Sequence, residues 1–119
     1  MKRAFRLRQS TDFTRVRRNG KSYQHPLVVL LTLPNPEGVV RIGVSAGKAV
    51  GNAVVRNRAK RQLRASIDCL FPRIFAGWDM VFLARGPIRD AEYDQILAGV
   101  ISVLSRANLL ERESAESND

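Results

Sequence analysis

The spacing of apolar and polar positions along the chain predicts short strands between helices. Residues 27–33 and 78–85 are largely apolar, are too short for free helices, and end at turn-forming Pro or Gly residues, which indicates strands. Residues 39–45 follow a proline-rich turn and are expected to pair antiparallel with 27–33. Residues 21–25 add a short edge strand in this interpretation, because Pro26 ends the run.

Three further stretches show helical spacing or helix start signals. They span residues 13–18, 53–70 and 91–106. Polar residues that favour helix N-caps precede each of them: the segment 10–12, Asn52 and Asp90. The order is therefore helix, one or two strands, strand, helix, strand, helix. This order predicts an α+β fold, a two-layer sandwich with the helices on one mixed central sheet.

The 53–70 helix is expected to carry an apolar stripe beside a band of cations. At about 100° per residue, the stripe contains Val55, Ala59, Leu63 and Leu70, with Ser66 between them. The band contains Arg56, Lys60 and Arg64, with Asn57 and Arg61 beside them and Arg58 on the other side of the stripe. Like charges three or four residues apart cost a few tenths of a kcal/mol each, or about 1 to 2 kcal/mol in this helix.

A helix that only faces water usually alternates positive and negative side chains, whereas here Asp68 alone offsets the cations. Arginine outnumbers lysine, and its planar fork suits bidentate contacts with phosphate. We therefore expect an anionic polymer to face this helix. A sequence-specific DNA regulator fits less well, because the cations follow the whole helix instead of gathering at its start.

Composition and charge agree with a nucleic-acid partner. The chain has 119 residues, 45% of them hydrophobic, a net charge of +9 and a pI of about 11.0. Residues 1–64 contain 15 Lys or Arg against two acids, whereas residues 65–119 contain 5 Arg against 9 acids. The partner should therefore meet the first half. We expect one domain over residues 1–110, with residues 1–9 as a basic arm and residues 111–119 as a disordered acidic tail.

Several other residues are expected to be structural. Cys69 lies at the edge of the apolar stripe, where a buried, inert thiol is expected, and a single cysteine excludes an internal disulfide. His25 is solitary, which argues against a metal or catalytic site. Asp90, Glu92 and Asp94 suit the positive end of the last helix. No signal peptide or apolar run of about 18 residues is present, so a cytoplasmic protein without a membrane partner is expected.

The basic stretch also carries a family resemblance. The run from Gly51 to Arg61, GNAVVRNRAKR, closely resembles the signature of the protein subunit of bacterial ribonuclease P, with Arg56-Asn57-Arg58 matching its Arg-Asn-Arg motif. The resemblance covers about residues 2–108. It includes Arg6-Leu7-Arg8 and Asp12-Phe13 near the start, Arg41 to Ser45 before the basic helix, and Asp79 to Arg85 as the last strand.

This resemblance implies a fold like the second domain of ribosomal protein S5, with a left-handed crossover through the basic helix between parallel strands. It also implies a bacterial ribonucleoprotein endonuclease that removes the 5′ leader from precursor tRNA. Its catalytic RNA subunit, with Mg²⁺, would supply the active site. The protein would bind that RNA and the leader, hold no cofactor itself and have no DNA partner. The alternative is a small structural RNA-binding protein of ribosomal type with no processing role.

The resemblance also implies residue roles. The positions that match RNA contacts are Lys48, Arg56, Asn57, Arg58, Lys60, Arg61 and Arg64. The positions that match the leader cleft are Phe13, Arg17, Val29, Leu31 and Ser45. The chain departs from the family by having Arg17 and Leu31 where an aromatic residue is frequent, and Gly47-Lys48-Ala49 where the family has Ser-Lys-Lys. Leader binding should therefore be more electrostatic here.

No residue of the chain itself is expected to be catalytic. A protein nuclease usually needs a pair of His residues, a His with a partner base, or clustered carboxylates that hold metals. This chain has one His, and its basic half contains only Asp12 and Glu37 as acids. Phosphate-binding Gly loops and zinc-ligand spacings are also missing from the sequence. Cleavage is therefore expected to depend on the RNA subunit.

Overall fold

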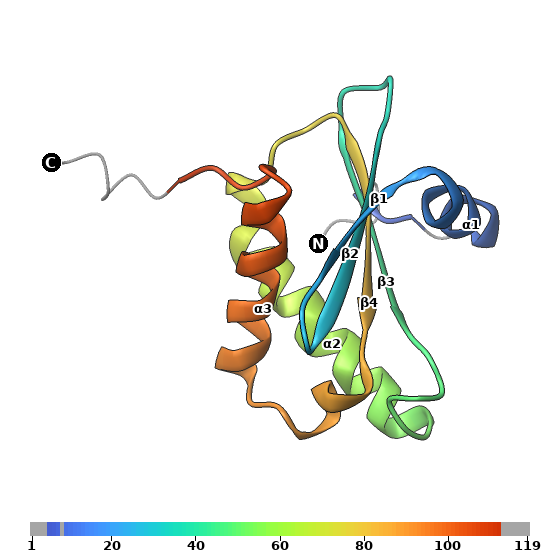
Figure 1. Ribbon diagram of the computed structural model, residues 1–119, viewed down its shortest axis with the longest axis vertical. Coiled ribbons are helices and arrows are strands. Elements are labelled where there is room, and N and C mark those ends of the chain that lie inside the picture. The colour runs from blue at the N-terminus through green and yellow to red at the C-terminus, as the bar shows by residue number, and fades with distance from the viewer. Residues whose placement is uncertain (1–4, 8, 113–119) are drawn as a thin grey trace, which may run out of the picture.

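The computed structural model describes residues 5–7 and 9–112 (Figure 1). The elements in chain order are α1 (Ser10–Asn19), β1 (Lys21–Gln24), β2 (Val28–Pro34), β3 (Val40–Ala46), α2 (Ala53–Leu70), the 3₁₀ turn η2 (Phe71–Arg73), β4 (Trp78–Ala84), the 3₁₀ turn η3 (Gly86–Asp90) and α3 (Tyr93–Arg106). Every predicted helix and strand is present, so the order of elements is confirmed.

The four strands form one mixed sheet in the order β1-β2-β4-β3. β2 pairs antiparallel with both β1 and β4, and β3 pairs parallel with β4. The predicted antiparallel pairing of 27–33 with 39–45 is therefore wrong. The two strands that are most apolar on both faces, β2 and β4, lie in the centre, where helices cover them, and β3 takes the edge. α2 connects the parallel strands β3 and β4; the left hand of this crossover stays a prediction.

The helices cover the two faces of the sheet unequally. α2 and α3 pack together on one face, and α1 lies on the other (Figure 1). The larger core lies between the sheet and the α2–α3 layer and includes Leu30, Ile42, Leu63, Phe82 and Ile96, all almost completely buried. A smaller cluster fills the space under α1 and contains the buried residues Leu7, Val16, Leu31 and Val81. The α+β class with helices on a mixed sheet is confirmed, and α1 adds partial cover to the second face.

α2 follows its predicted pattern. The side chain of Asn52 caps the helix by accepting a hydrogen bond of 3.0 Å from the Val55 N–H. Most of the predicted stripe is buried, and Ile67 joins it, while Val55 is half-buried. Cys69, in contrast, is exposed, so the expectation of a buried thiol is wrong. At about 100° per residue, Cys69 points about 120° away from Leu63 and therefore toward solvent.

The predicted starts of α1 and α3 need correction. α3 begins at Tyr93, and Glu92 is its N-cap in a capping box with Gln95, whereas Asp90 belongs to η3. α1 begins at Ser10 instead of Phe13, and no side chain caps it. In both cases several polar residues lie near the start of the helix, and the backbone that tertiary packing imposes decides at which residue the helix begins.

The termini were predicted as a basic arm and an acidic tail. The described part of the arm, Phe5 to Leu7, lies against the edge of β3, where the Leu7 N–H donates a hydrogen bond of 2.8 Å to the Ile42 carbonyl. Residues 1–4, residue 8 and residues 113–119 lie outside the described part of the chain. Among the described helices, none has both the length and the apolar character needed to cross a membrane.

Candidate nucleic-acid interface

The first candidate surface is the basic band on α2. Asn57, Arg58 and Arg61 are exposed, and Arg56, Lys60 and Arg64 are half-buried beside the apolar stripe, as the helical spacing predicts. Within residues 5–7 and 9–112, these side chains make no ion pair with a carboxylate. Lys48 is also exposed, in the turn between β3 and α2. The structure therefore presents the predicted cations together on one helix and its entrance.

Three acidic residues, two in the basic half of the sequence and one on β4, form ion pairs with arginines outside this band. Asp12, Asp79 and Glu37 pair with Arg15 and Arg41 under and beside α1. Because arginine stays protonated at neutral pH, the α2 band carries a net positive potential. Such a band attracts a polyanion and releases its counterions on binding.

The second candidate surface is the side of the sheet that faces α1. The strand registers align Gln24, Val29, Leu83 and Ser45 in one row across β1, β2, β4 and β3. Val29, Leu83 and Ser45 are half-buried, and Gln24 is exposed, so this row is partly open to solvent. Apolar side chains beside a hydroxyl and an amide suit contacts with bases and sugars of a single strand.

Phe13 covers the neighbouring row, which contains Leu31, Val81 and Gly43. A Cβ atom added to Gly43 would lie 2.6 Å from Cζ of Phe13, so the absence of a side chain at position 43 makes room for the aromatic ring. Phe13 is half-buried and packs on the cluster under α1, whereas Leu31 is only 8% exposed. Phe13 thus serves both as core and as a partly exposed ring, and Leu31 serves mainly as support.

The structure brings four of the predicted leader-cleft residues onto this face: Phe13, Val29, Leu31 and Ser45. Arg17 is exposed on α1, one helical turn after Phe13, so its guanidinium emerges on the same side of that helix. The role of each of these residues stays a prediction. The basic band lies on a different layer, since α2 packs on the opposite face of the sheet (Figure 1).

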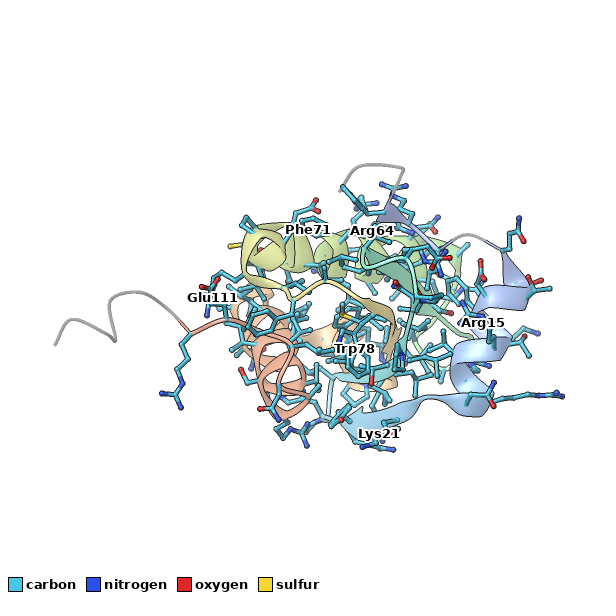
Figure 2. All side chains as sticks on the ribbon, turned by 90° about the horizontal axis from the view of Figure 1, so that it is seen from above. Arg15, Lys21, Arg64, Phe71, Trp78 and Glu111 are labelled. Atoms are coloured by element: carbon cyan, nitrogen blue, oxygen red, sulfur yellow. The ribbon has the colours of Figure 1, made fainter. Side chains whose placement is uncertain are left out.

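Asp79 is an important residue that sequence reasoning missed. It is completely buried on β4, and Arg15 of α1 donates to its Oδ2 at 2.6 Å. Arg41 of β3 donates from Nε to Oδ1 at 2.8 Å and from Nη2 to Oδ2 at 3.1 Å. Asn35 donates to Oδ1 at 3.1 Å. Figure 2 shows Arg15 beside α1, from which it reaches the sheet. The Asp79 cluster (Asp79, Arg15, Arg41 and Asn35) therefore fixes α1 to the sheet.

The electrostatics of this cluster follow from its geometry. Burial alone would raise the pKa of the Asp79 carboxyl, but the hydrogen bonds from Arg41, Arg15 and Asn35 favour the ionised form, and together they lower the pKa. The hydrogen bonds to Asp79 in turn raise the pKa of Arg15 and of Arg41. A single acid inside the otherwise apolar run Trp78 to Ala84 is the signal that could have identified this cluster.

The described residues offer little for chemistry on a substrate. Nδ1 of His25 accepts a hydrogen bond of 3.1 Å from the Leu27 N–H, and a Cβ atom added to Gly99 would meet the imidazole ring at 2.9 Å. His25 therefore shapes the turn between β1 and β2 and its contact with α3. In the described part of the chain, no group of three or more His, Cys, Asp or Glu residues is placed to hold a metal ion. The arrangement is suited to binding.

Comparison with known proteins supports one family throughout. A family model described as Ribonuclease P matches residues 1–108. The ribonuclease P protein component of Roseiflexus castenholzii is 39% identical over 120 residues, which cover 100% of this chain and 98% of that protein. The corresponding protein of Herpetosiphon aurantiacus is 40% identical over 120 residues, with the same coverage of 100% and 98%.

Solved structures agree with the sequence relatives. The Staphylococcus aureus RNase P protein superposes with a TM-score of 0.83 at 32% identity, covering 92% of this chain and 100% of that one. The RNase P protein from Thermotoga maritima superposes with a TM-score of 0.77 at 27% identity, covering 85% of this chain and 96% of that one. Sequence and fold lead to the same assignment: the chain belongs to the ribonuclease P protein family.

Proposed function

We propose that this protein is the RNA-binding subunit of the endonuclease ribonuclease P and helps a catalytic RNA subunit to remove the 5′ leader from precursor tRNA. The observation that carries the proposal is the positive band on α2, which contains the intact Arg56-Asn57-Arg58 motif. The band would contact the RNA subunit, because arginine forks bind phosphates in pairs of hydrogen bonds. Membership in the ribonuclease P family favours this role over that of a structural ribosomal protein.

The leader would bind along the α1 face of the sheet. A single RNA strand needs partly exposed apolar or aromatic surface for its bases and cations for its phosphates. The partly exposed surface for the bases would come from Phe13, Val29 and Ser45, with Leu31 beneath them. The cation for a phosphate would come from Arg17 at the rim. Arg17 replaces an aromatic residue that is frequent in the family. Its contact with the leader would be electrostatic, so salt should weaken leader binding more than it would weaken binding by stacking.

The chemistry would belong to the RNA subunit and its Mg²⁺ ions. The protein would raise the local affinity for substrate and metal by placing positive charge beside the RNA, so less Mg²⁺ would be needed to screen the phosphates. Because precursor tRNA is its substrate, the holoenzyme would act in the bacterial cytoplasm.

Reconstitution provides the test. Purified protein, cognate RNA subunit and both together are incubated with 5′-labelled precursor tRNA across a Mg²⁺ series. We expect no cleavage by the protein alone and the largest stimulation of the RNA subunit at the lowest Mg²⁺ concentrations. Metal-dependent cleavage by protein free of RNA would refute the proposed division of labour. Sequencing of RNA that copurifies with the protein separates the alternatives, since ribosomal RNA in place of the RNA subunit would support the structural role.

A further inference from the structure

The described part of the N-terminal arm is held in place at three successive residues. The ring of Phe5 contacts that of Phe71 at the end of α2, with centroids 5.2 Å apart and planes at 43°. Arg6 pairs with Ile42 as a short parallel bridge on the free edge of β3. Leu7 is buried in the cluster under α1. The arm thus connects the end of α2 to the β3 edge and to the α1 layer.

The bridge to β3 determines the direction in which Arg6 points. Paired residues on neighbouring strands place their side chains on the same face, and successive residues alternate between faces. Ile42 points into the core on the α2 side, and Leu7 lies in the cluster on the α1 side. The Arg6 side chain is therefore directed to the α2 side of the sheet, where it is exposed.

This direction turns Arg6 toward the layer that contains α2 and Arg64. Burial lowers the pKa of the half-buried Arg64 guanidinium, and the positive charge of Arg6 lowers it further. Neither arginine makes an ion pair with a carboxylate in the described part of the chain. Figure 2 shows Arg64 and Phe71 along α2, and Phe71 is the residue whose ring contacts Phe5. Two like charges therefore lie on the α2 side of the sheet, within electrostatic range of each other, and none of the described carboxylates pairs with either of them.

We infer that Arg6 and Arg64 together form a binding site for a phosphodiester group of RNA, and that the anchored residues 5–7 are a fixed part of the RNA interface. A phosphate between the two guanidiniums would relieve their mutual repulsion and accept charge-assisted hydrogen bonds from both. The site extends the α2 band toward β3 and the arm. This inference rests on the proposed function, because it names a further contact of the same RNA-binding surface.

The anchoring of the arm gives a test that does not change any charge. Phe5→Ala removes the contact with Phe71 and loosens the link between the arm and α2, while Arg6 and its bridge to Ile42 are retained. If the arm is pre-organised, binding of the cognate RNA subunit should weaken about two- to tenfold, because the arm must then be ordered on binding. Phe75→Ala is the matched control, since Phe75 is 48% exposed in the loop before β4. An affinity equal to the wild type in Phe5→Ala would refute a pre-organised arm.

The charge itself is tested with Arg6→Ala, Arg64→Ala and the double variant. Each single change should weaken binding about tenfold and reduce the salt slope by about 0.7 to 0.9 if it removes one phosphate from the interface. The double variant should weaken binding by less than the product of the two single effects, because both residues hold one phosphate. Arg89→Ala, on the 3₁₀ turn η3, controls for the removal of one positive charge.

Two readouts identify the source of the phosphate. If the variants bind the isolated RNA subunit more weakly, the phosphate belongs to that subunit. If they bind it normally but the holoenzyme loses affinity for precursor tRNA and not for mature tRNA, the phosphate belongs to the leader. Arg58→Ala serves as the reference for the proposed function. If Arg58→Ala weakens binding and Arg6→Ala behaves as Arg89→Ala, only the Arg6–Arg64 site is refuted. If none of these variants alters RNA binding, the proposed function fails as well.

Discussion

At the scale of single residues, Asp79 determines how α1 is held on the sheet. Its carboxylate is completely buried and accepts from three side chains of three different segments. Removing one partner of such a group leaves a buried charge unpaired. The resulting loss in the free energy of unfolding is larger than the contribution of an exposed ion pair. The carboxylate and its donors therefore act as one unit that couples α1, β3 and β4.

Asp79→Asn should therefore destabilise the protein. The substitution keeps the size of the side chain but leaves Arg15 and Arg41 without their shared anion, so the free energy of unfolding should fall by about 3 kcal/mol. Denaturant unfolding at pH 7 measures this change, with the exposed Asp94→Asn on α3 as the control. Equal stability of the two variants would contradict the role assigned to the Asp79 cluster.

The same residue predicts how stability depends on pH. The pKa of Asp79 is lower in the folded protein than in the unfolded chain, where it is about 3.9. Its contribution is therefore complete above the unfolded pKa and is lost as the pH falls through the folded pKa. The free energy of unfolding of the wild type should decrease as the pH falls below about 5, and Asp79→Asn should show a shallower decrease. Parallel curves for the two proteins would argue against the lowered pKa.

Gly43 is the residue on which the position of Phe13 depends. Gly43→Ala places a methyl group where the Phe13 ring lies, 2.6 Å from Cζ, and the ring must move because the β3 backbone is paired with β4. We expect a decrease of about 1 to 2 kcal/mol in the free energy of unfolding and a weaker preference of the holoenzyme for precursor over mature tRNA. Gly47→Ala is the control, since no heavy atom lies within 4 Å of its added Cβ. An unchanged preference for precursor tRNA would show that the position of Phe13 does not matter for leader binding.

At the scale of elements, α2 combines two functions on one helix. Its apolar stripe anchors it to the sheet, and its cations remain available because Asp12, Asp79 and Glu37 are paired with other arginines. Repulsion between like charges at i, i+3 and i, i+4 costs this helix about 1 to 2 kcal/mol in total. Under the proposed function, the RNA partner would reduce that repulsion when it binds.

Arg58→Ala and Arg61→Ala test this element. Both side chains lie on the solvent side of α2, so the fold should be unaffected, while binding to the RNA subunit should weaken. The slope of log affinity against log salt should fall by somewhat under one for each phosphate that is no longer bound, with coefficients of about 0.7 to 0.9. Arg89→Ala provides a variant with the same charge change outside the band. Unchanged affinity and slope in both α2 variants would mean that this helix face is only solvated.

At the scale of the whole molecule, the two candidate surfaces lie on different layers. α2 belongs to the layer on one face of the sheet, and the row of Val29, Leu83 and Ser45 belongs to the other face. β3 lies at the edge of the sheet, and Arg6 and Leu7 lie along that edge. Under the proposed function, one layer would contact the RNA subunit while the other contacts the leader.

This arrangement predicts a holoenzyme whose preference for the leader depends on salt. Precursor tRNA should bind more tightly than mature tRNA, and rising salt should reduce the difference, because Arg17 contributes charge where stacking is reduced. Arg17→Ala should lower the preference at least as much as Phe13→Ala. Arg18→Ala, the exposed neighbour on α1, is the control for charge. Affinities for both tRNAs across a salt series provide the measurement, and a preference that ignores both salt and Arg17 would place the leader elsewhere.

Much of the fold was predictable because its signals are local. The caps, breakers and periodic patterns predicted every helix and strand, and the 100° spacing on α2 separated its buried stripe from its cations. The errors concern relations between segments. The partner of β3, the exposure of Cys69 and the cap of α3 depend on which surfaces meet, and a local pattern does not contain that information.

The sequence by itself determined the α+β class, the family motif at Arg56-Asn57-Arg58 and the charge difference between the two halves of the chain. Each of these depends on residues that are near one another in the sequence. Their spacing defines a helix face or a strand, whichever segment later packs against it. Only the tertiary structure decided that Phe13 rests on Gly43, that Asp79 joins Arg15 to Arg41 and that the arm directs Arg6 toward Arg64. Those contacts join residues far apart in the chain, and their energies depend on burial and strand register, which arise when the layers pack.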